Sequence, residues 1–92
     1  MEQCLMITLT VGSLKGFLDN FIRNSASKLR LEGVAQLVAD NHVRIIVCGE
    51  SNHVDTFIDT LFEKSTKYKL DGIQIESYFK ERDYRGVFRI VA

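Results

Sequence analysis

The fold of this chain is limited above all by the order in which apolar side chains repeat along it. Residues 5–11 alternate between apolar and polar side chains, which is the period of a strand with one buried face. Residues 16–30 repeat at helical spacing, and residues 52–62 do so again. Each helical segment lies between strand-like segments, so we expect one sheet that both helices share.

The individual faces can be read from the same spacing. The first strand turns Leu5, Ile7, Leu9 and Val11 to one side, and the first helix aligns Leu18, Ile22, Ser25 and Leu29, flanked by Phe17 and Phe21. Gly33 ends that helical segment. Further strands are predicted at 34–38, 42–48, 73–79 and 87–91.

Turn and cap residues complete this outline. Asp40-Asn41 predicts a tight turn, because asparagine tolerates left-handed backbone angles. Asn52, supported by Asp55, predicts the N-cap of the second helix. A loop through Asp71-Gly72 is expected before the fourth strand, and a charged loop at residues 80–83 before the last one.

The resulting order is βαββαβ with one more strand at the C-terminus. Two amphipathic helices need a shared sheet on which to bury their apolar stripes. The sequence therefore predicts a ferredoxin-like α+β sandwich, in which an antiparallel sheet carries two helices on one face. At 92 residues, the chain 1–92 is expected to form a single domain.

Composition and charge exclude several classes of function. Formal net charge is +0, so the chain as a whole does not attract nucleic acid or anionic lipid. Apolar runs fall short of the ~20 residues that span a bilayer, and residues 1–4 lack the start of a signal peptide. We expect a cytoplasmic protein without membrane attachment. Aromatic and basic residues in 78–85 resemble a single-strand binder, but strand 42–48 lacks RNA-recognition aromatics, so no nucleic acid is expected.

The segment between the first strand and the first helix is the most promising binding loop. Two glycines four residues apart allow a tight turn, and the amides that open the helix are free to meet an anion. The expected partner is phosphate or another small anion. The anion-binding candidates are Gly12, Ser13, Leu14, Lys15, Gly16 and, further along the helix, Arg23. His42 and His53 lack the spacing of metal ligands, so neither a metal nor another cofactor is expected.

Several short motifs occur in an order typical of one family. Gly12 and Gly16 are followed by Leu31-Glu32-Gly33, then by a Gly-x4-Val-x2-Phe-x3-Leu pattern over 49–61, and last by a Gly-x-Phe-x-Ile pattern over 86–90. In this order and spacing the chain resembles the acylphosphatase family over nearly its whole length.

The resemblance implies a metal-independent hydrolase of acyl phosphates. In that family an arginine and loop amides hold the phosphate, and an asparagine on the second strand places the attacking water. Counted from Gly16, the arginine position is Asn20; counted from Gly33, the asparagine position is Leu37. The first helix is one residue shorter than in the family, which makes Asp19 the alternative for the arginine. Because none of these is a cation or a water-placing amide on that strand, we expect a catalytically degenerate, acylphosphatase-like protein.

Two other functions remain open. Lys15 or Arg23 could replace the missing charge in a divergent acylphosphatase that hydrolyses the carboxyl-phosphate bond. The simpler interpretation makes Lys15 a solvated turn residue and pairs Arg23 with Asp19 at i,i+4 spacing. The chain could also be a structural or interaction module that merely shares the fold.

The two cysteines form the last candidate site. In a ferredoxin-like sheet the first and third strands are antiparallel neighbours, and Cys4 begins one while Cys48 ends the other. Both then lie on the sheet face without helices, which also bears Met6 and Ile46. We expect the two thiols to be neighbours, with a disulfide and a pair of reduced thiols both open.

Overall fold

The computed structural model describes residues 2–79 and 84–91, and the charged loop expected at 80–83 lies outside these ranges. Its elements, in chain order, are β1 (Glu2–Val11), η1 (Phe17–Ile22), α1 (Arg23–Lys28), β2 (Glu32–Ala39), β3 (His42–Glu50), α2 (Ser51–Glu63), α3 (Ser65–Tyr68), β4 (Leu70–Ser77) and β5 (Phe88–Val91).

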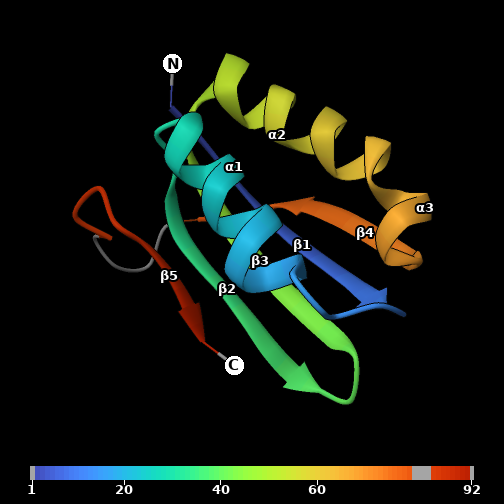
Figure 1. The fold of residues 1–92 in the computed structure, drawn as a ribbon. Helices are drawn as coiled ribbons and strands as arrows, with labels where there is room; N and C mark the ends of the chain where they lie inside the picture. The colour runs from blue at the N-terminus through green and yellow to red at the C-terminus, as the bar shows by residue number, and fades with distance from the viewer. Residues whose placement is uncertain (1, 80–83, 92) are drawn as a thin grey trace.

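The strands form one sheet in the order β4-β1-β3-β2-β5. The β1–β3, β1–β4 and β2–β3 pairs are antiparallel, and the terminal strand β5 adds to β2 in parallel. Figure 1 shows α1 and α2 side by side over one face of this sheet. The predicted ferredoxin-like α+β fold, including the short extra C-terminal strand, is confirmed.

The core lies between this sheet face and the helices. The alternation predicted for β1 is confirmed, because Leu5, Ile7, Leu9 and Val11 are all buried while the residues between them are half-buried. From α2, Phe57 is fully buried against them. Burial of one such side chain contributes about 1.5–3 kcal/mol, so this layer supplies much of the stability of the domain.

The first helix departs from the predicted regular α-helix. Its first part, η1, is a π-helix, and only Arg23–Lys28 is α-helical. A π-turn takes one residue more than an α-turn, which shifts every later side chain around the helix axis. For this reason Ala26 is fully buried, whereas Ser25, which we expected on the buried face, is only half-buried.

The predicted N-cap of the second helix is wrong. Helix α2 begins at Ser51 with Glu50 as its N-cap, and Glu50 forms no side-chain capping hydrogen bond. Asn52 therefore lies inside the first turn. The helix follows β3 without a loop, because the strand continues to Glu50 instead of ending at Cys48.

The loop expected at Asp71-Gly72 is part of β4. Thr10 pairs with Asp71 and Thr8 with Gln74, so two residues of β4 lie opposite one residue of β1. This is a β-bulge, and Gly72 has the positive φ of 60° that such a bulge favours. The other strand ends lie within three residues of the predicted ones, and those at residues 11, 42 and 91 coincide with them.

Candidate functional site

The loop between β1 and η1 is fastened to the end of α3. The amide of Gly12 donates to the carbonyl of Lys69, and the amide of Ser13 donates to the carbonyl of Tyr68, both over 2.9 Å. A Cβ on Gly12 would lie 2.7 Å from the Cβ of Lys69, so the two segments approach too closely for a side chain. Two of the amides that we expected to face an anion are therefore occupied within the protein.

Aromatic side chains hold the helix to the same point. The Tyr68 ring packs against Phe17 at 5.2 Å and against Phe21 at 5.4 Å between centroids. Contacts of this geometry add about 0.5–1.5 kcal/mol each beyond the area they bury. The loop at residues 12–16 is thus fixed at both ends by one residue of α3.

The rest of the loop is open. The amides of Leu14, Lys15 and Gly16 donate no hydrogen bond among the described residues. Gly16 adopts a left-handed conformation with φ 77°, and its carbonyl accepts from the amide of Phe21. Lys15 is exposed, and its side chain has no partner in the described part of the chain. Three amides and one ammonium group are available to an anion here.

The positions at which we expected catalytic side chains carry residues of other types. Asn20 is exposed, and its side-chain carbonyl accepts a hydrogen bond of 2.7 Å from the amide group of Asn24. Leu37 is half-buried and packs against the core, whereas its neighbour Gln36 pairs in register with Arg44. Asp19 is exposed in the first turn of η1.

The π-turn contains both candidates for the arginine position. Counting from Gly16 gives Asn20, and counting back from Gly33 gives Asp19. A π-turn changes the direction in which each later side chain leaves the helix axis. Counting residues therefore does not decide whether Asn20 or Asp19 faces the loop. Neither residue is a cation.

Arg23 lies away from this loop. Its side chain lines a groove of about 540 Å³ together with Ser27, Arg30 and the segment at Gly86, and residues 12–16 do not line that groove. No ion pair between Arg23 and Asp19 is present within 2–79 and 84–91. The sequence reasoning missed Arg30 and Gly86 as neighbours of Arg23, and only the helical spacing of Arg23 and Ser27 was a usable signal.

Both histidines lie at the surface. His42 is exposed, and its ring nitrogen Nδ1 bonds the carbonyl of Asp40 at 2.8 Å; His53 is exposed on α2. Across the described residues there is no group of three or more metal-binding side chains. A helix of sufficient length and apolarity to cross a bilayer is likewise absent from them.

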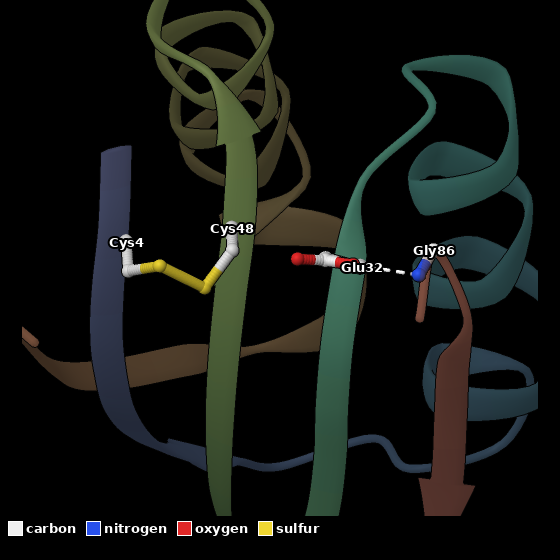
Figure 2. Close-up of a disulfide and its surroundings, with 4 residues drawn as sticks. All are labelled: Cys4, Glu32, Cys48 and Gly86. Carbon is white, nitrogen blue, oxygen red and sulfur yellow. Dashed lines mark hydrogen bonds between the residues drawn. A yellow bond between two sulfur atoms is a disulfide. The ribbon is translucent and has the colours of Figure 1, made fainter. Parts of the chain in front are cut away.

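Cys4 and Cys48 lie directly opposite one another in the β1–β3 pair and form a disulfide, with 4.1 Å between their Cα atoms. Glu32 follows in the same row on β2, and its carboxylate accepts a hydrogen bond of 2.7 Å from the amide of Gly86. Figure 2 shows these four residues across the sheet. The disulfide joins the two central strands, and Glu32 joins β2 to the turn before β5.

Comparison with known proteins agrees with this architecture. A family model for acylphosphatase matches residues 15–90. An acylphosphatase from Coxiella burnetii superposes with a TM-score of 0.81 at 22% identity, over 97% of this chain and 92% of that one. One from Bacillus subtilis gives 0.82 at 21% identity over the whole of both chains. Full-length HypF in a phosphate- and nucleotide-bound form gives 0.77 at 22% identity, over this whole chain but 12% of HypF. No curated protein sequence matches the chain.

Proposed function

The chain belongs to the acylphosphatase family, and we propose that it is a catalytically degenerate member that binds phosphate or a similar small anion without hydrolysing acyl phosphates. The proposed anion site comprises the amides of Leu14, Lys15 and Gly16 with the ammonium group of Lys15.

One comparison carries this proposal: at the positions that the family resemblance assigns to the catalytic arginine and asparagine, this chain has neither residue. Asn20 and Asp19 carry no positive charge, and the side-chain carbonyl of Asn20 is bonded to Asn24. Leu37 packs against the core and has no group that could orient water. Loss of one preorganised donor lowers a rate by about 10²–10³, and the loss of a cation and an amide together lowers it further, though not additively.

The free loop amides support retention of anion binding. Backbone N–H groups bind oxyanions without help from a side chain, and a single lysine adds a point charge. HypF, a structural neighbour, is known in a phosphate-bound form, which makes phosphate a reasonable first ligand to test. Without the planar fork of an arginine, we expect weak binding.

The test is a titration of the protein with inorganic phosphate, in which the amide chemical shifts of residues 14–16 report binding. We expect saturable shifts in this loop, and Lys15→Gln should weaken binding several-fold because it removes the point charge. Lys28→Gln, which removes a charge at the far end of α1, serves as the control and should leave binding unchanged. Absence of loop shifts would remove the anion-binding part of the proposal.

A divergent acylphosphatase is the alternative that Lys15 favours, because this ammonium group is exposed beside the free amides. Turnover of benzoyl phosphate that Lys15→Gln abolishes would select it. A structural or interaction module is the remaining alternative, and a protein with neither phosphate binding nor turnover would select that one.

A further inference from the structure

The groove beside Arg23 has a volume of about 540 Å³ and lies between the α1 helix and the turn that leads into β5. Arg23, Ser27 and Arg30 form its polar wall. Arg23 and Ser27 are four residues apart on α1, so their side chains leave the same side of the helix, and Arg30 follows directly after the helix. Gly86 and Phe88 form the opposite wall.

The two arginines supply the positive charge of this groove. In the described part of the chain, neither guanidinium group forms a hydrogen bond or an ion pair. Each presents up to five N–H donors in a planar fork, which suits phosphate and carboxylate groups. The C-terminal end of a helix carries about half a negative charge, which repels an anion, but the two guanidinium groups carry two full positive charges and outweigh it.

The backbone of Arg30 decides which substitution best tests its side chain. Arg30 adopts a left-handed conformation with φ 55° directly after the helix. Its amide bonds the carbonyl of Ser27, and the amide of Leu31 bonds the carbonyl of Ala26. This is a Schellman motif, and glycine is the residue that fits its left-handed position with least strain. Glycine at position 30 would therefore remove the guanidinium group without straining the backbone.

The opposite wall is held in place. The amide of Gly86 donates a hydrogen bond of 2.7 Å to the carboxylate of Glu32 on the neighbouring strand, as Figure 2 shows. Leu31, which is buried, and Phe88, which packs against the core, supply apolar surface along the groove. The groove is thus polar on the side of α1 and apolar on the side of the sheet.

We propose that this groove is a second anion site, separate from residues 12–16, for a small organic anion. Its phosphate or carboxylate group binds Arg23 and Arg30, and its apolar part lies against Leu31 and Phe88. The volume falls in the range of about 300–1,000 Å³ that small-molecule sites occupy, and it exceeds what a bare ion fills.

The test uses phenyl phosphate, benzoate and inorganic phosphate as probes, with the amide shifts of Ser27, Gly86 and Phe88 as the signal. We expect saturable shifts with both aromatic probes and weaker binding of inorganic phosphate, which has no apolar part. Tighter binding of phenyl phosphate assigns a phosphate head group, and tighter binding of benzoate assigns a carboxylate.

The decisive variant is Arg30→Gly. Glycine suits the left-handed position, so the thermal midpoint should hold or rise while affinity falls roughly tenfold or more with the loss of a charge-assisted contact. Lys69→Gly is the matched control, since Lys69 is also a cation at φ 55° after a helix and does not line the groove. Shifts confined to residues 14–16, or unchanged affinity in Arg30→Gly, would overturn the proposal.

Discussion

At Gly33 the strand β2 passes so close to β3 that a side chain does not fit. A Cβ there would overlap the carbonyl oxygen of Ile46, and the backbone has a φ of 141°. We predict that Gly33→Ala lowers the free energy of unfolding by about 3 kcal/mol or more, through overpacking and backbone strain together.

Gly72→Ala is the comparison for this prediction. Gly72 also has a positive φ, of 60°, but no atom lies within 4 Å of the place that an added methyl group would take, so only the backbone penalty of about 1–2 kcal/mol applies. Urea denaturation of both variants measures the difference. Equal losses in the two would show that the close approach to Ile46 contributes nothing.

Single residues were predictable from sequence where the chemistry is local. Asn41 adopts the expected left-handed turn, with φ 58°, and its side chain donates to the carbonyl of Val11. Asn52 failed as an N-cap because β3 continues into α2 and leaves Glu50 at the junction. Arg30 and Gly86 were not linked by any local pattern, since only the pairing of β5 with β2 brings their segments together.

At the level of elements, the π-helix η1 behaves as an α-helix with one inserted residue. Deletion of Asn20 should convert it to a regular α-helix that still keeps Phe17, Leu18, Phe21 and Ile22 on the buried face. We predict a folded protein with a free energy of unfolding within about 1 kcal/mol of the parent, because the buried side chains keep their places.

Deletion of Thr56 in the regular helix α2 is the matched control. It would rotate Phe57 and Leu61, both fully buried, away from the core and cost about 3 kcal/mol or more. Circular dichroism and urea denaturation of both deletions test the account. A deletion of Asn20 as damaging as that of Thr56 would contradict it.

The disulfide acts between the two central strands. It closes a loop with a sequence separation of 44 residues, for which the loss of unfolded-state entropy corresponds to about 2–4 kcal/mol of stability. The variant Cys4→Ala/Cys48→Ala should lose this amount in urea denaturation. Reductant should destabilise the parent equally and leave the variant unaffected; no effect of reductant on the parent would show that the bond does not form.

Strands and helices were predictable where the apolar side chains repeat with one period along the whole element, as in β1 and α2. They were mispredicted where tertiary pairing outweighs a local signal. Asp71-Gly72 has the composition of a turn, yet pairing with Thr10 draws it into β4 as a bulge. The π-turn in η1 could not be predicted because residues 17–22 alone fit an α-helix equally well.

For the whole molecule, the order of strands and helices was sufficient to predict the ferredoxin-like arrangement of the first four strands and the helices on one face of the sheet. It also predicted that Cys4 and Cys48 would be neighbours, since that follows from the pairing of β1 with β3. The groove between α1 and β5 could not be predicted in this way, because the prediction of a short terminal strand gave no position for it in the sheet. The cytoplasmic location stays a prediction.

The measurement that tests the central claim most directly is hydrolysis of benzoyl phosphate. The parent is compared with Asn20→Arg/Leu37→Asn and, because the π-turn leaves two counts for the arginine position, with Asp19→Arg/Leu37→Asn. The matched control is Asn24→Arg/Leu37→Asn, which places the same arginine one turn further along the helix. We predict no turnover by the parent or the control above the spontaneous rate, and a gain of at least about 10²-fold in one restored variant. Efficient turnover by the parent would contradict the account.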